Sequence, residues 1–118
     1  MTPHPTEIKL KKAEKKLEIK FDDGERFILT AEFLRVESPS AEVQGHGTNQ
    51  KKIVAGRRHV AIMAIEPVGN YAIRILFDDL HDTGIYSWAL LHEMGRNQEK
   101  LWKDYLSALR RANLSRDP

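Results

Sequence analysis

The sequence of 118 residues predicts an α+β domain in which two antiparallel β units are covered on one face by C-terminal helices. Two observations lead to this prediction. Apolar and polar residues alternate with the period of half-buried strands in several short runs before residue 78. From Ser87 onward, apolar residues instead recur at the spacing of amphipathic helices. We therefore expect the sheets to come first in the chain and most of the helix to come last.

The first β unit is predicted to be a three-stranded meander. Lys11–Lys16 is interpreted as its first turn, and Asp22-Asp23-Gly24 is a strong turn signal before a third strand at residues 26–29. The apolar positions that alternate with polar ones in the first two strands are Ile8, Leu10, Leu17, Ile19 and Phe21.

A short helix and a long loop follow the meander. Thr30 is a candidate N-cap for a helix over Ala31–Arg35, whose Phe33 and Leu34 are expected to face inward. Residues 36–59 are rich in glycine, serine and charge and have no apolar periodicity. A loop of this length inside a compact domain is usually functional or mobile.

The second β unit is predicted as a central hairpin. Residues 60–66 form a continuous apolar run suited to a central strand, and residues 67–70 turn the chain into an alternating strand over residues 71–77. Two helices are then expected. Ser87 would cap a helix that ends at Gly95, and Asn97 would cap the last one. Both tryptophans, Trp88 and Trp102, are interpreted as core residues.

Length and composition are typical of one globular domain. We expect the domain to span residues 7–112, with flexible tails at 1–6 and 113–118. Apolar residues make up 41% and charged residues 31%, and the net charge of +2 is too small to predict nucleic-acid binding. The absence of cysteine excludes disulfides and thiolate metal sites within this chain. No membrane span or signal peptide is evident, so we expect a monomeric cytoplasmic protein.

The segment from Asp78 to Gly84 concentrates the candidate chemistry. It holds three carboxylates and one imidazole within seven residues, namely Asp78, Asp79, Asp82 and His81. These groups, with His46 from the long loop, are candidates for binding a divalent cation. The alternative is that the aspartates accept backbone N–H bonds in a tight turn, as this residue type commonly does. No other histidine spacing, and no nucleophile elbow, indicates an active site.

Three blocks of sequence resemble one known family. They are residues 33–43, with the sequence FLRVESPSAEV, residues 65–72, with the sequence IEPVGNYA, and residues 77–88, with the sequence FDDLHDTGIYSW. Together they are similar to the gamma-butyrobetaine hydroxylase-like N-terminal domain, also called the domain of unknown function 971. The resemblance covers roughly residues 8–109 and is closest to the bacterial members that consist of this domain alone.

The resemblance implies a zinc site that this chain has largely lost. In the eukaryotic hydroxylases the domain binds zinc through three cysteines and a histidine. The matching positions here are Ser38, Ser40, Val43 and His81, so only the histidine of the ligand set remains. Leu80 occupies a position where related sequences usually have glycine, which implies strain if that position needs a positive φ.

The resemblance also bears on function. The oxygenase domain that follows this module in the hydroxylases has no counterpart after Leu109, so we expect no catalytic residues and no bound cofactor. The function we expect is that of a small accessory or protein-interaction module with a protein partner. The alternative is a metal-binding module or subunit linked to 2-oxoglutarate oxygenases or iron–sulfur assembly. The candidate interaction surface comprises Ser38, Ser40, His46, Asp79, His81 and Asp82.

Overall fold

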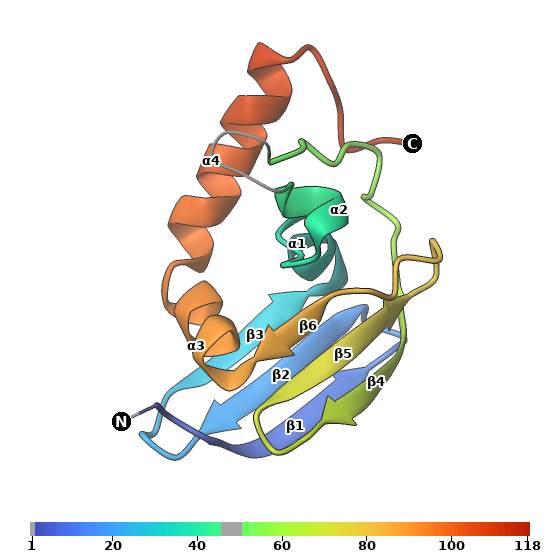
Figure 1. Cartoon of the computed structure of the whole chain (residues 1–118). Coiled ribbons are helices and arrows are strands. Elements are labelled where there is room, and N and C mark those ends of the chain that lie inside the picture. Colours follow the sequence, from blue (N-terminus) through green and yellow to red (C-terminus); the bar gives the residue numbers. More distant parts are fainter. Residues whose placement is uncertain (1, 46–50) are drawn as a thin grey trace.

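The computed structural model describes residues 2–45 and 51–118 as two three-stranded antiparallel sheets with four helices beside them (Figure 1). The first sheet has the order β1-β2-β3 and is the expected meander, formed by Pro5–Lys11, Lys16–Phe21 and Arg26–Thr30. Its first strand begins at Pro5, inside the segment that we expected to be a tail. Backbone bonds from that segment explain the earlier start, since the carbonyl of His4 accepts from the amide of Asp22 at 2.8 Å.

The second sheet has the order β4-β5-β6, formed by Ile62–Val68, Ala72–Phe77 and Ile85–Ser87. The predicted hairpin is present, with Ile65 opposite Ile75, but its first strand is an edge strand and not the central one. Pro67 lies within β4 and has no N–H to donate, a residue that sheets accept only at an edge or a bulge. The central strand is β5, which has β4 on one side and β6 on the other.

The helices are α1 (Ala31–Val36), α2 (Ala41–Gln44), α3 (Trp88–Arg96) and α4 (Gln98–Arg111). The side chains of Thr30 and Ser87 cap α1 and α3 as predicted, since each accepts a backbone amide of the first turn. Asn97 does not cap α4 with its side chain, which instead donates to the carbonyl of Glu93 in the preceding helix. No helix among the described residues has both the length and the apolar content needed to cross a bilayer.

Gly95 does not end the helix as expected from the sequence, because it lies inside α3. A Cβ at this position would lie 2.3 Å from Cγ of Phe27 on β3. The glycine therefore lets the helix backbone approach an aromatic ring on the first sheet. In this way α3 joins the first sheet, through β3, to the second sheet, through β6.

The apolar core lies between the sheets and the helices. Its fully buried side chains come from both sheets and from α1 and α3, and include Leu17, Ile19, Phe33, Leu34, Ile75, Phe77, Tyr86 and Leu91. A smaller cluster joins Val36 of α1 to Tyr105 and Leu109 of α4. Trp88 and Trp102 are only partly buried, at the margin of the core.

Two segments that we expected to be irregular have defined contacts. The stretch 36–59 contains α2, and its Val54 carbonyl accepts from the hydroxyl of Tyr105 at 2.6 Å. Residues 113–118 are not a free tail, because the carbonyls of Ser115 and Arg116 accept backbone amides from residues 56 and 58. Figure 1 shows this segment returning from the end of α4 to the loop before β4.

Candidate functional site

The structure brings the segment after α1 against the turn after β5. Ser38 follows α1 directly, and His81 lies in the turn that leaves β5. Ser38 Oγ is 2.8 Å from His81 Nε2, although the two residues are 43 positions apart in the chain. Both side chains are buried, with 0% of Ser38 and 3% of His81 exposed. The two segments that the family resemblance connects are therefore neighbours in space.

A glutamate that the sequence did not single out completes this group. His81 Nδ1 is 3.0 Å from Oε2 of Glu42, which lies in the first turn of α2. In the form of the neutral ring that carries its proton on Nδ1, Nδ1 donates to Glu42 and Nε2 accepts from the Ser38 hydroxyl. The only sequence signal for Glu42 was its place within the lost ligand segment, four residues after Ser38.

The remaining polar atoms of the group are satisfied from within. The amide of Ser40 donates to Ser38 Oγ at 3.2 Å, and Ser40 Oγ lies 2.7 Å from Oγ1 of Thr83. Thr83 in turn donates to Oε1 of Glu42 at 3.4 Å. Gly84 lies so close that a Cβ on it would be 2.7 Å from Ser38 Oγ. We call the six residues Ser38, Ser40, Glu42, His81, Thr83 and Gly84 the serine–histidine cluster.

The residues at the family's ligand positions do not fit a zinc ion. Val43 places a buried aliphatic side chain where a donor would be required, and serine hydroxyls are poor zinc ligands near neutral pH. Both ring nitrogens of His81 already have hydrogen-bond partners within the cluster. A hydrogen-bonded group of side chains thus lies at the place that the resemblance assigns to the family's metal ligands.

The aspartates of the turn do not gather around His81 as a cation site would require. Among the described residues, no three groups of histidine, aspartate or glutamate are placed to hold a metal together. Asp79 Oδ1 accepts the amide of His81 at 3.2 Å, which is the turn-capping alternative, and Asp78 Oδ1 accepts the amide of Ala61 before β4 at 3.0 Å. Asp82 is exposed, and His46 lies outside the described residues.

Asp79 is held by two arginines. Its Oδ2 accepts from Nε of Arg35 and from Nε of Arg57, both at 2.8 Å. Burial alone would raise the pKa of Asp79, but the bonds from Arg35 and from the His81 amide hold that pKa below its usual value. Arg35 Nη1 is buried and has no hydrogen-bond partner among the described atoms. This ion-pair group braces the turn from its inner side.

Leu80 is the exposed part of the same turn. Its side chain is 88% exposed, the largest exposed fraction of any large apolar residue described. Its φ of 72° lies in the left-handed region, where a residue with a Cβ is strained. The strain expected from the sequence is therefore present. Backbone bonds enclose the residue, since Phe77 donates to the carbonyl of His81 and Leu80 donates to the carbonyl of Phe77.

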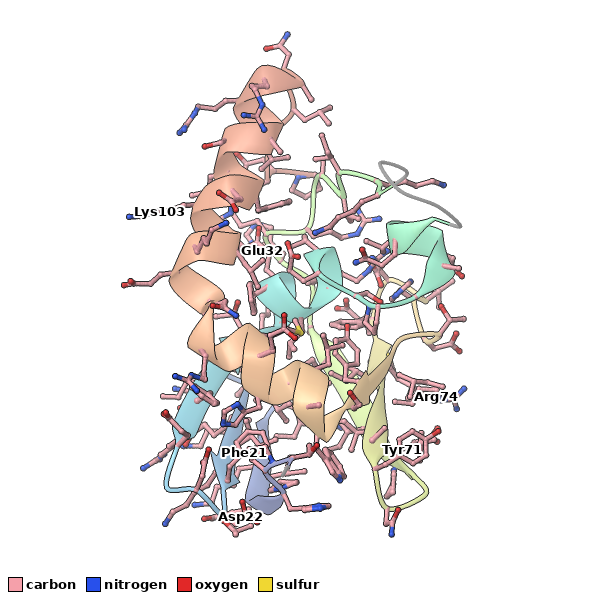
Figure 2. All side chains as sticks on the ribbon, turned by 60° about the vertical axis from the view of Figure 1, so that its left-hand side comes forward. Phe21, Asp22, Glu32, Tyr71, Arg74 and Lys103 are labelled. Carbon is pink, nitrogen blue, oxygen red and sulfur yellow. The ribbon has the colours of Figure 1, made fainter. Side chains whose placement is uncertain are left out.

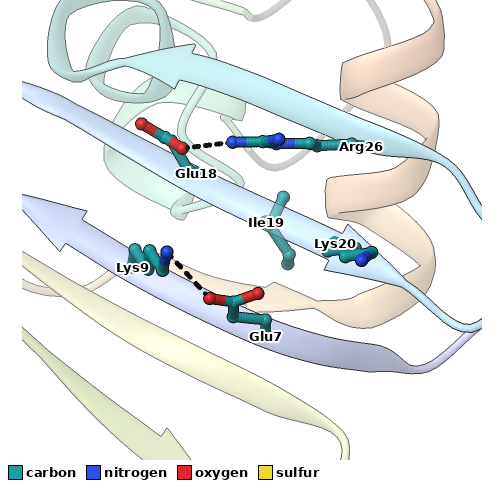
Figure 3. A pocket seen from close by; sticks show the side chains of 6 residues that line it. All are labelled: Glu7, Lys9, Glu18, Ile19, Lys20 and Arg26. Atoms are coloured by element: carbon teal, nitrogen blue, oxygen red, sulfur yellow. Dashed lines mark hydrogen bonds and ion pairs between the residues drawn. The ribbon is translucent and has the colours of Figure 1, made fainter.

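A shallow polar hollow on the outer face of the first sheet is a separate feature (Figure 3). It measures about 90 Å³ and is lined by Glu7, Lys9, Glu18, Ile19, Lys20 and Arg26. Hydrogen bonds from Lys11 and Arg26 lower the pKa of Glu18 to about 2. Figure 3 shows Glu7 paired with Lys9 along β1, and Glu18 of β2 paired with Arg26 of β3. Ion pairs within the sheet itself therefore account for most of the charge that lines this hollow.

Known proteins resemble this chain over most of its length. One protein with an NMR solution structure is 43% identical, covers 100% of this chain and 93% of its own, and has a TM-score of 0.87. Another with an NMR solution structure is 52% identical, covers 99% of this chain and 87% of its own, and has a TM-score of 0.84. None of the curated proteins matches.

A third similar structure carries a family name. It is the crystal structure of a protein of unknown function of the DUF971 family from Acidithiobacillus ferrooxidans. It is 36% identical, covers 78% of this chain and 92% of its own, and has a TM-score of 0.66. The family model described as gamma-butyrobetaine hydroxylase-like, N-terminal, matches residues 8–92. The chain therefore belongs to the gamma-butyrobetaine hydroxylase-like N-terminal family, the DUF971 family.

Proposed function

We propose that this domain is a non-catalytic protein-interaction module whose contact surface is the turn around Leu80. The observation that carries the proposal is the combination of exposure and strain at this one residue. Burial of an apolar side chain is favourable, so leaving it in water is a cost to stability. A left-handed φ costs roughly 1–2 kcal/mol for a residue with a Cβ. Leu80 bears both costs in the isolated domain. Residues held in such conformations cluster at functional sites.

The rigidity of the turn supports the same proposal. Asp79 is fixed by Arg35 and Arg57, and the His81 amide donates to Asp79 Oδ1 at 3.2 Å. A leucine presented on a fixed backbone loses little conformational entropy when it enters a partner's pocket. The exposed carboxylates of Asp78 and Asp82 flank it on either side. The partner that fits is a protein with an apolar pocket rimmed by lysine or arginine.

The serine–histidine cluster resembles the serine–histidine–acid arrangement of hydrolases, and its burial favours a structural role instead. A catalytic serine must place its Oγ against a substrate carbonyl. Here 0% of Ser38 is exposed, and the backbone of Gly84 lies against its Oγ. The interaction surface expected from the sequence therefore changes. Ser38, Ser40 and His81 are buried, and they contribute to it only by holding the turn in place.

The experiment that tests this function is site-specific photocrosslinking in the native host. A photoreactive amino acid replaces Leu80 in one full-length variant and Ile28 in a control variant. Ile28 is also an exposed apolar residue, at 46%, but it lies on the first sheet. We expect a discrete crosslinked protein from position 80 that is lost when excess wild-type domain competes, and no such product from position 28. The same product from both positions would contradict the proposal.

Other expectations stay predictions from the sequence. They are a cytoplasmic setting, a monomeric state and the lack of a nucleic-acid partner. The alternative of a metal-linked role in oxygenase or iron–sulfur assembly systems also rests on the resemblance. No contact among the described residues favours it over the interaction module.

A further inference from the structure

A buried carboxylate on α1 takes no part in the serine–histidine cluster or in the Leu80 turn. Only 7% of Glu32 is exposed, and Figure 2 shows it on α1 beside α4. A carboxylate taken out of water is destabilising unless a cation or several donors compensate for the lost hydration. The group that compensates here comes from a segment 84 residues later in the chain.

Arg116 provides this cation in a two-pronged geometry. Its Nε donates to Oε2 of Glu32 at 2.8 Å, and its Nη2 donates to Oε1 at 2.7 Å. Its Cζ also lies 5.2 Å from the centre of the Trp102 ring on α4. Parallel bonds to both carboxylate oxygens, with an aromatic face beside them, match a planar guanidinium and not a lysine ammonium. Trp102, expected to be a core residue, thus presents a ring face to a charged group.

The site is open on one side. Beside Arg116 is a hollow of about 340 Å³, whose lining includes Thr30, Phe33 and Val60. The Arg116 side chain is itself 30% exposed, so the guanidinium can be reached from solvent. A longer ligand therefore has space next to the arginine position.

The segment that carries Arg116 is otherwise held by an ion pair between Arg58 and Asp117 and by two backbone bonds. Gly56 donates to the carbonyl of Ser115 at 2.9 Å, and Arg58 donates to the carbonyl of Arg116 at 3.0 Å. Both bonds go to main-chain carbonyls, which the backbone of an incoming peptide also provides. Every residue from Ala112 to Pro118 except Arg116 is exposed. A segment without buried apolar side chains opens at a low free-energy cost.

We propose that Glu32 and Trp102 form a guanidinium-binding site that Arg116 occupies within the chain, and that this site accepts an arginine from an extended segment of a partner protein when residues 113–118 move away. The amides of Gly56 and Arg58 would then pair with the backbone of the incoming segment. Arg116 acts as an internal competitor for this site. The inference does not depend on the role proposed for Leu80.

The test uses the full chain with Arg116→Ala, which empties the side-chain position and leaves the rest of the segment intact. The probe is the blocked peptide Leu-Ser-Arg-Asp-Pro, and the readouts are tryptophan fluorescence and the melting temperature. We expect saturable binding that raises the melting temperature of the variant, with at least about tenfold weaker binding of the same peptide carrying lysine. Wild-type protein should bind more weakly than the variant, because Arg116 competes.

Two further variants keep the test decisive. Arg116→Ala combined with Glu32→Gln should lose the preference for the arginine peptide, because the carboxylate that receives the guanidinium is gone. Arg116→Lys keeps the charge of the segment, and should also bind the peptide more tightly than wild type does, which covers a failure of the alanine variant to fold. The inference is wrong if neither single variant binds the arginine peptide saturably, or if the arginine and lysine peptides bind equally.

Discussion

Two features of Leu80 oppose the stability of the isolated domain. Its φ is left-handed, a conformation that glycine adopts without a Cβ clash. Its apolar side chain is exposed to solvent on the outer side of the turn. The Leu80 side chain adds little packing to the fold, since 88% of the residue is exposed to solvent. Residues held in such conformations cluster at functional sites, which supports the partner contact proposed for this turn.

The first prediction concerns this strain. Leu80→Gly should raise the free energy of unfolding by about 1 kcal/mol, because relief of the strained φ exceeds the extra entropy of glycine in the unfolded chain. Denaturant unfolding of both proteins measures the difference. Gly24→Ala is a matched control, because it places a Cβ at a φ of 87° in an open turn and should destabilise the domain. A less stable Leu80→Gly variant would show that the turn is not strained.

The second prediction concerns His81. The carboxylate of Glu42 beside Nδ1 should fix the neutral ring in the form that carries its proton on Nδ1. Long-range proton–nitrogen NMR spectra distinguish the two forms, and the exposed His59 provides a reference ring. Added zinc should leave the His81 signals unchanged, because both nitrogens are already bonded. Zinc-dependent shifts at His81 with stoichiometric binding would instead restore a metal role.

At the scale of elements, close contacts between distant chain segments determine features that local sequence patterns did not predict. Gly95 looked like a helix-ending glycine, but the ring of Phe27 occupies the space where its side chain would lie. The third prediction is that Gly95→Ala destabilises the domain, because overpacking costs typically 1–3 kcal/mol and outweighs the roughly 1 kcal/mol gained in helix propensity. In a Phe27→Ala background the same change should be stabilising. Equal effects in both backgrounds would disprove the contact.

The fourth prediction concerns the pairing of β2 with its neighbours. Hydrogen bonds from Lys11 and Arg26 lower the pKa of Glu18 from 4.5 to about 2. A lowered carboxyl pKa contributes stability above pH 4.5, and this contribution is lost as the pH falls through about 2. Glu18→Gln should therefore be less stable at neutral pH, and its deficit should shrink across that window. A deficit independent of pH would mean that the ion pairs contribute nothing.

Local signals were enough to predict most elements. The alternation of apolar and polar residues predicted the strands of the meander and the hairpin. Thr30 and Ser87 predicted the starts of two helices. Each of these features depends on neighbouring residues alone. The edge position of β4 and the packing of residues 113–118 depend on partners far along the chain. Glu42 was missed for the same reason, since only the fold brings it to His81.

At the scale of the whole molecule, the polar groups divide into those that stabilise the fold and those that remain available. The serine–histidine cluster and the carboxylates of Asp79 and Glu18 have partners within the fold. The two surfaces proposed for partners are the exposed Leu80 turn and the site of Glu32 and Trp102, which Arg116 fills within the chain. In Figure 2 Tyr71 and Arg74 point outward from the second sheet, and Arg74 is already paired with Glu66.

The most direct test of the central claim measures stability and binding in the same variant. Leu80→Gly is compared with wild type for its free energy of unfolding and for its ability to displace the protein captured by crosslinking from position 80. The interaction-module proposal predicts opposite changes: a more stable domain that binds the partner at least about tenfold more weakly, since a fully buried leucine contributes roughly 1.5–3 kcal/mol. A more stable Leu80→Gly variant that displaces the partner as well as wild type would contradict it.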